Sequence, residues 1–87
     1  MTSNAEKLKR LSAQAALDAL MAEKASESAA SKYDAEVAKD EYIRSSGAAS
    51  AAVRWLDAKR KEESLDKDIA LLRQLADELR ARSLQQV

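Results

Sequence analysis

The sequence predicts an all-α protein that folds as an antiparallel two-helix hairpin of the coiled-coil type. Three observations support this fold class. Alanine and leucine supply 19 and 11 of the 40 hydrophobic residues, and the charged residues Glu, Lys and Arg rank close behind them as helix formers. The 87 residues include no proline and one glycine, which lies near the middle of the chain. Two apolar patterns of helical spacing flank that glycine, so we expect one domain over residues 1–87.

The first helix is expected over residues 4–45, approximately. Ser3 and Glu6 have the spacing of a capping box, in which each side chain satisfies a backbone N–H group at the start of a helix. No residue from there to Arg44 breaks a helix, and the arginine suits the negative end of the helix dipole. Serines between Ser26 and Ser31 lower helix propensity, so a three-helix chain with a break there is the alternative.

A turn is expected over residues 46–50, approximately, and a second helix from about 51 to 84. Gly47 is suited to the left-handed conformation that follows a helix C-terminus. Ser46 or Ser50 could cap the second helix, since serine is a preferred residue at the start of a helix.

The apolar residues on the two sides of Gly47 do not belong to one continuous pattern, which favours a turn over one long helix. Before the glycine, the pattern comprises Leu8, Leu11, Ala15, Ala22, Ala29 and Tyr33. After it, the pattern comprises Ala51, Trp55, Ala58, Glu62, Leu65, Ile69, Leu72, Ala76, Leu79 and Ser83. When the second pattern is extended backward past Gly47, it falls on charged residues, among them Glu41, Asp34 and Glu27, and does not join the first.

Folding the chain at Gly47 brings the two apolar patterns together. The numbers of facing residues then add up to about 94, which places an alanine opposite a leucine in three successive layers. These layers are Ala15–Leu79, Ala22–Leu72 and Ala29–Leu65, followed by Glu36–Ala58. Glu62 falls at a core position opposite Lys32 and Tyr33, where one polar residue is expected to fix the pairing of the helices rather than to act as a catalytic acid.

The predicted hairpin has more apolar residues than its two facing stripes can bury. The residues that point away from the predicted stripes or widen them are Leu17, Leu20, Met21, Leu71 and Leu75. They lie at one level in the half of the hairpin distant from the turn, so we expect them to form an oligomer interface that completes a four-helix bundle by homodimerisation. The alternatives are a bent hairpin or third helix that covers them, or burial against a different protein.

A second apolar cluster lies on the two sides of the turn. It consists of Tyr42, Ile43, Val53, Trp55 and Leu56, and it holds the only tryptophan of the chain. Tryptophan and tyrosine dominate binding hot spots, so this cluster is the candidate surface for a larger protein partner. The alternative is that the aromatic rings close the end of the hairpin.

Composition argues against most catalytic and cofactor chemistry. The chain has no cysteine and no histidine, which removes thiolate nucleophiles and the usual zinc and haem ligands, and one glycine cannot form a phosphate-binding loop. We therefore expect no cofactor, no metal and no enzyme activity, although a Ser–Lys dyad or a carboxylate pair remains formally possible. Glu36, Asp40 and Glu41 could converge on a cation, but no other type of ligand lies near them in the sequence, so a metal site is not expected there.

Charge and hydropathy restrict the expected partners and location. The net charge is zero and the pI about 6.3, so nucleic acid is not an expected partner. Lys59-Arg60-Lys61, the only basic run, is flanked by acidic residues. No apolar stretch approaches the roughly 18 residues of a membrane span, and the N-terminus lacks the layout of a signal peptide. The expected location is the cytoplasm, and no membrane partner is expected.

These observations predict a non-enzymatic protein–protein interaction module. It would act as a small inhibitor or adaptor that occupies a surface of a larger protein, a role filled in some systems by virus-encoded blockers of host proteins. The alternative is a structural subunit or scaffold of a larger assembly, and a nucleic-acid-binding helical dimer ranks third. The predicted shape is similar to that of secreted WxG-type hairpins, but no Trp-x-Gly occurs at the turn and Trp55 lies eight residues after Gly47.

Overall fold

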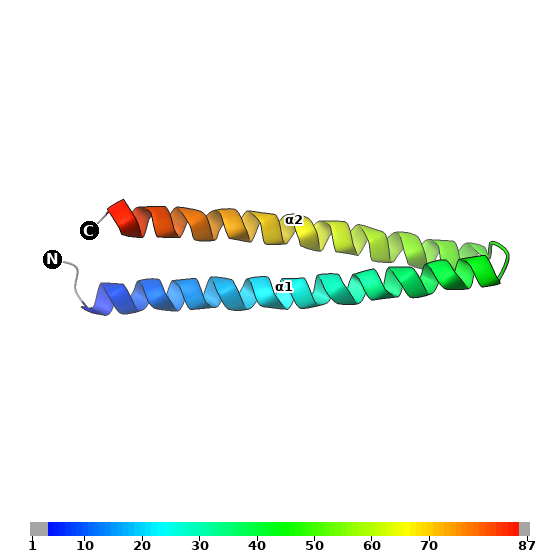
Figure 1. Cartoon of the computed structure of the whole chain (residues 1–87), viewed down its shortest axis with the longest axis horizontal. Helices are drawn as coiled ribbons and strands as arrows, with labels where there is room; N and C mark the ends of the chain where they lie inside the picture. The colour runs from blue at the N-terminus through cyan, green and yellow to red at the C-terminus, as the bar shows by residue number, and fades with distance from the viewer. Residues whose placement is uncertain (1–3, 86–87) are drawn as a thin grey trace.

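The protein is an antiparallel hairpin of two long helices (Figure 1). A computed structural model describes the backbone of residues 4–85 and the side chains of residues 4–82. Helix α1 (Asn4–Arg44) and helix α2 (Ala49–Gln85) pack against each other along a rod with extents of 68 × 16 × 12 Å. The predicted all-α hairpin is confirmed, and the three-helix alternative is wrong because α1 continues without a break through Ser26–Ser31. The predicted capping residue Ser3 lies outside the described residues.

Helix α1 ends in a Schellman motif. The N–H of Gly47 donates to the carbonyl oxygen of Tyr42 at 2.9 Å, and the N–H of Ser46 donates to that of Ile43 at 3.2 Å. Gly47 has a φ of 97°, as predicted for a positive-φ residue, but Ser46, with a φ of 56°, takes the position where glycine is most common. The turn therefore contains two residues with positive φ, Ser46 and Gly47, and only Gly47 was predicted from the sequence.

Helix α2 begins without a serine cap. Ala48 precedes the first helical residue, and its carbonyl accepts from the N–H groups of Ala51 and Ala52 at 3.2 Å. The hydroxyl of Ser45 accepts from the N–H of Ala48 at 3.2 Å and donates to the carbonyl of Tyr42 at 3.1 Å. The predicted capping role of Ser46 or Ser50 is therefore wrong, because the helix starts between them and Ser45 organises the turn instead.

The packing stripe of α2 agrees with the prediction, whereas that of α1 does not. On α2, the buried residues are Ala51, Leu65 and Ala76, all in the predicted pattern. On α1, the buried or half-buried residues are Arg10, Gln14, Leu17, Met21, Lys24, Glu27, Ser28, Ser31, Ala35 and Ala38. All six residues predicted to face α2 are exposed, including Leu8 and Leu11 at 66% and Tyr33 at 71%.

The error on α1 concerns the rotation of the helix and not its level along α2. The Ser28 hydroxyl donates to Asp66 Oδ1 at 2.7 Å, and Arg54 forms an ion pair with Glu41, so the numbers of facing residues still add up to about 94. The observed stripe is offset by one position from the predicted one, since Gln14, Met21 and Ser28 directly precede Ala15, Ala22 and Ala29. This offset corresponds to a rotation of about 100°. The predicted alanine–leucine layers and the Glu36–Ala58 pair are therefore wrong, because Glu36 and the three alanines of those layers (Ala15, Ala22 and Ala29) are exposed.

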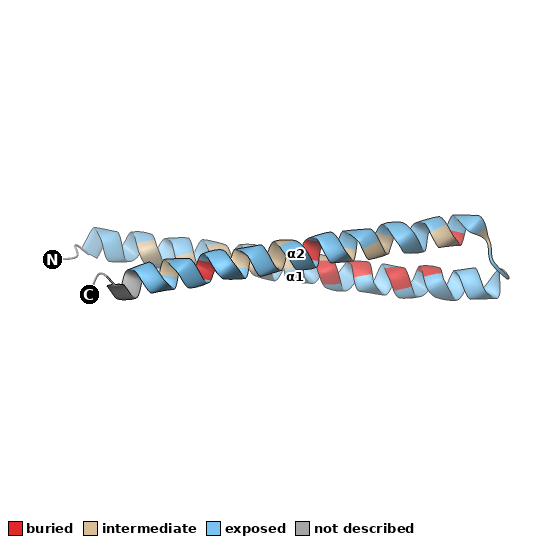
Figure 2. Cartoon of the chain, turned by 90° about the horizontal axis from the view of Figure 1, so that it is seen from above, coloured by how far each residue is buried: buried red, intermediate tan, exposed pale blue. Residues whose placement is uncertain are grey.

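The observed rotation lets the helices approach closely near the turn. Ser28, Ser31, Ala35 and Ala38 follow one another on α1, and each is 5% exposed or less (Figure 2). Small side chains at a helix contact shorten the distance between the axes, since ridges on one helix meet shallow positions on the other. The core of this half is thus built from small residues, and no large side chain among the described residues is fully buried.

Glu62 lies at the packing stripe of α2, as predicted. Its side chain is 14% exposed, and its Oε2 atom lies 3.7 Å from Nζ of Lys59 on the same helix. No hydrogen bond to this oxygen is present among the described residues. The expected neighbours Lys32 and Tyr33 are both exposed, so their pairing with Glu62 is wrong for the same reason of helix rotation.

Candidate interaction surfaces

The exposed apolar residues of the hairpin gather mainly at two places, one at each half. We call the first the tip cluster, which is the set Tyr42, Ile43, Val53, Trp55 and Leu56. We call the second the distal face, which is the set Leu20, Leu71 and Leu75. All eight side chains are at least 36% exposed in the single chain.

Two residues of the tip cluster, Tyr42 and Trp55, line an apolar hollow between the ends of the two helices. The hollow has a volume of about 360 Å³ and is lined by Lys39, Tyr42, Ala52 and Trp55. Tyr42 also lies beside the turn, because its hydroxyl oxygen is 3.5 Å from the place that a Cβ on Gly47 would take. The Tyr42 ring therefore lies against the turn, and a concave, accessible surface remains between it and Trp55.

Charges at the tip differ between the two sides of the helix contact. On one side, Arg54 and Glu41 join the helices through an ion pair. On the other side, Lys39 lines the apolar hollow, and it forms no ion pair with any residue whose side chain the structure describes. A partner's side chain that fills this hollow would therefore contact an apolar surface with one cation at its edge.

The distal face combines residues from both helices, as predicted for part of the set. Leu20, Lys24, Asp68, Leu71 and Leu72 line a shallow hollow of about 260 Å³, which places Leu20 beside Leu71. Leu75 follows Leu71 by one helical turn and is 52% exposed.

Leu17 and Met21, the other two predicted members of the distal interface, do not point away from α2. Both are half-buried on the packing stripe of α1, because that helix is rotated from its predicted orientation. The observed distal face is therefore narrower than the predicted one.

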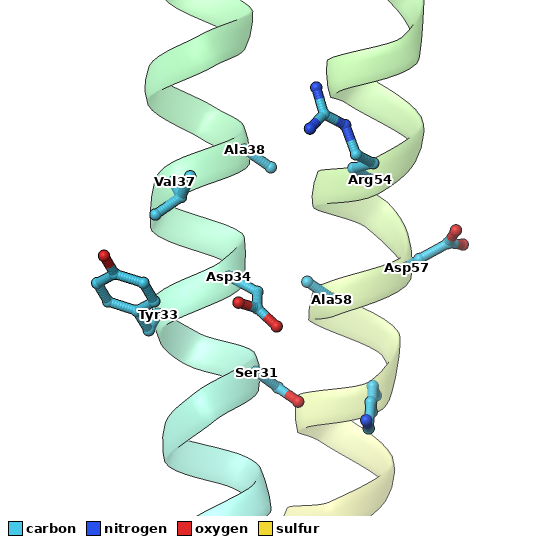
Figure 3. A pocket seen from close by; sticks show the side chains of 9 residues that line it. Ser31, Tyr33, Asp34, Val37, Ala38, Arg54, Asp57 and Ala58 are labelled. Carbon is cyan, nitrogen blue, oxygen red and sulfur yellow. The ribbon is translucent and has the colours of Figure 1, made fainter.

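A third hollow lies between the helices, on the turn side of their midpoint (Figure 3). It has a volume of about 490 Å³ and is lined by Ser31, Tyr33, Asp34, Val37, Ala38, Arg54, Asp57, Ala58 and Lys61. Acidic and basic groups both border it, while Tyr33 and Val37 point away from α2. This balance gives the hollow no preference for a cation or an anion.

Some exposed apolar residues were missed as surface candidates by the sequence analysis. Leu8, Leu11 and Tyr33 were assigned to the core, and Val37 was not considered; all four are exposed. The signal that could have identified them is the 4-3 series that runs from Gln14 through Ser28 to Ala38. That series contains serines and a lysine, so a search for apolar periodicity passes over it.

Within residues 4–82, no group of three or more acidic side chains is placed to hold a metal ion. Neither described helix contains a stretch apolar enough to cross a membrane. Comparison with protein-family models, curated proteins and solved structures finds no match to this chain.

Proposed function

We propose that this chain is a non-enzymatic interaction module that binds a larger protein through its tip cluster, as an inhibitor or adaptor. The observation that carries the proposal is the apolar hollow between Tyr42 and Trp55, the site of the only tryptophan in the chain. Rigid aromatic side chains around a concave apolar surface are typical of the centre of a protein interface. The hairpin holds this surface at the end of a rod, where a partner can reach it from several directions.

The charge at the rim indicates the chemistry of the partner surface. Lys39 lines the hollow without an ion pair among the described side chains. A partner that inserts an apolar side chain beside a carboxylate would fill the hollow and pair with this lysine. Complementary charges at an interface rim raise association rates and discriminate among partners more than they raise affinity.

The proposal is tested by quantitative affinity capture with the intact chain and three variants. Ala52→Glu fills the hollow with a charged side chain, and Trp55→Ala removes one wall, so both are expected to reduce capture of a specific partner at least tenfold, on the order of one hot-spot residue. Tyr33→Ala is the control, since Tyr33 is more exposed than Trp55 and lies outside the tip cluster.

Circular dichroism of each variant confirms that the hairpin is still folded. A partner captured equally by the wild type, Ala52→Glu and Trp55→Ala would contradict binding through the tip.

A structural subunit of a larger assembly is the second candidate. Leu8 and Leu11 are exposed near the free end of α1, in addition to the tip cluster and the distal face, and several apolar surfaces on one chain favour several contacts. Light scattering of the purified chain separates the two candidates: growth with concentration beyond a dimer supports an assembly subunit, and a species of fixed size supports the module.

A further inference from the structure

We infer that the distal face binds a second copy of this chain in an antiparallel arrangement centred on Leu75, in which Asp68 of each copy faces Arg82 of the other. This inference goes beyond the proposed function and does not depend on the tip cluster. It rests on the exposed area of the hairpin, on the position of the distal leucines and on the charges that flank them.

The hairpin exposes enough surface to form a stable interface with a second copy of itself. The single chain exposes 6684 Å². A compact protein of 9.5 kDa would expose about 5,000 Å², so the hairpin exposes roughly 1,600 Å² more than its mass requires. A stable interface of standard size buries about 800 Å² on each partner, which is well within this excess.

Two leucines of the distal face, Leu71 and Leu75, form part of a continuous stripe on α2. Asp68, Leu71, Leu75, Glu78 and Arg82 follow one another at alternating intervals of three and four residues, and this spacing keeps them on one side of the helix. Leu20 of α1 adds to the same face, because it shares a hollow with Asp68 and Leu71. The apolar centre of the stripe is thus bordered by an acid on one side and by an acid and a base on the other.

The positions of the flanking charges select the orientation of the second copy. Asp68 and Arg82 each lie seven residues from Leu75, in opposite directions. An antiparallel copy centred on Leu75 therefore brings Asp68 level with Arg82 of the second copy, twice in the dimer. A parallel copy in register would bring each charge opposite itself, and like charges at an interface disfavour that pairing.

Other groups on this face are compatible with the antiparallel arrangement. Lys24, which also lines the distal hollow, forms an ion pair with Glu27 at 3.9 Å. Glu78 comes level with Leu72 of the second copy rather than with an acid. Neither Asp68 nor Arg82 forms an ion pair within the part of the single chain that the structure describes, so both are available to a second copy.

The experiment measures the oligomeric state of the full chain by sedimentation equilibrium, with a charge exchange as its central arm. The wild type is expected to dimerise, and Leu75→Glu is expected to raise the dimer dissociation constant at least tenfold, on the scale of one hot-spot residue. Tyr33→Glu, at a more exposed position outside the distal face, is the matched control and should dimerise like the wild type.

The charge variants test the orientation itself. Asp68→Arg alone and Arg82→Asp alone should each dimerise more weakly than the wild type, because each sets like charges against each other. An equal mixture of the two variants should form a heterodimer, since both of its contacts then join an acid to a base. A wild type that stays monomeric at millimolar concentration would overturn the inference, and so would a mixture that dimerises no better than the separate variants. Neither result would affect partner capture through the tip cluster, which tests the proposed function separately.

Discussion

Small side chains on α1 set the distance between the helices near the turn. Ala35 is 1% exposed and lies on the packing stripe, whereas Ala29 is exposed although the apolar pattern placed it opposite Leu65. Exchanging either alanine for leucine changes helix propensity little, so the two substitutions report mainly on packing. These two positions therefore distinguish the observed rotation of α1 from the predicted one.

Ala35→Leu is expected to lower the free energy of unfolding by about 1–3 kcal/mol, because the larger side chain does not fit between closely packed helices. Ala29→Leu should change it by less than about 0.5 kcal/mol, as is usual for an exposed site. Urea denaturation followed by circular dichroism measures both values. A larger loss for Ala29→Leu than for Ala35→Leu would restore the alanine–leucine layers of the sequence analysis.

The turn offers a second prediction at the level of single residues. Ser46 has a φ of 56°, where a residue other than glycine is strained by roughly 1 kcal/mol, so Ser46→Gly should leave stability unchanged or raise it by up to about 1 kcal/mol. Gly47→Ala should lower it by about 1 kcal/mol through backbone strain, since the added Cβ would make only an ordinary contact with Tyr42. Thermal unfolding of the two variants gives the signs. A destabilisation of similar size in both would contradict the assigned role of Ser46.

At the level of the helices, burial is distributed unevenly along α1. Its fully buried residues all lie between Ser28 and Ala38, and the positions that face α2 nearer the N-terminus, such as Gln14, are only half-buried. Local opening is easier where few groups are buried, so amide protection should decrease from the turn side of the midpoint toward the free ends.

Hydrogen exchange followed by mass spectrometry checks this gradient. Amides of residues 28–38 are expected to exchange at least ten times more slowly than those of residues 5–14, on the scale of a local opening free energy that differs by about 1.4 kcal/mol. The Leu75→Glu variant is the appropriate sample, because self-association would protect the distal half. Uniform protection along α1 would show that the hairpin opens as one unit.

The helices and their pairing level were predictable from the sequence, and the rotation of α1 was not. The chain has one glycine and no proline, so it reverses once, at Gly47. This reversal determines which residues of α1 and α2 lie at the same height along the rod, as the Ser28–Asp66 hydrogen bond shows. The rotation depends on which residues fit a close contact. Alanines occur on nearly every side of α1, and Ser28 is acceptable at the contact because it is small and its hydroxyl has a partner. An apolar pattern carries little information about such a contact.

The same distinction explains the outcome for the candidate surfaces. The five tip residues are near one another because they flank the turn, and this follows from sequence distance alone. Leu20 and Leu71 come together because the pairing level was correct. Leu17 and Met21 left the predicted interface because their position depends on the rotation of α1.

At the scale of the whole molecule, the hairpin is a slender rod. Its radius of gyration is 19.5 Å, whereas a compact domain of the same length would have one of about 12 Å. In the antiparallel dimer centred on Leu75, two rods of 68 Å overlap over about 50 Å, and the two tip clusters project from opposite ends. Such a dimer would present two copies of the proposed partner-binding surface, which makes it a bivalent adaptor.

Small-angle X-ray scattering tests this arrangement through the length of the particle. The level of Leu75 lies about 40 Å from the turn at 1.5 Å per residue, so the antiparallel dimer should have a maximum dimension of roughly 85 Å. A parallel dimer in register would keep the 68 Å length of one hairpin. The Leu75→Glu monomer provides that 68 Å reference in the same buffer. A wild-type particle with twice the mass of the monomer and the same length would contradict the antiparallel overlap, while a length near 85 Å would place the two tips at opposite ends.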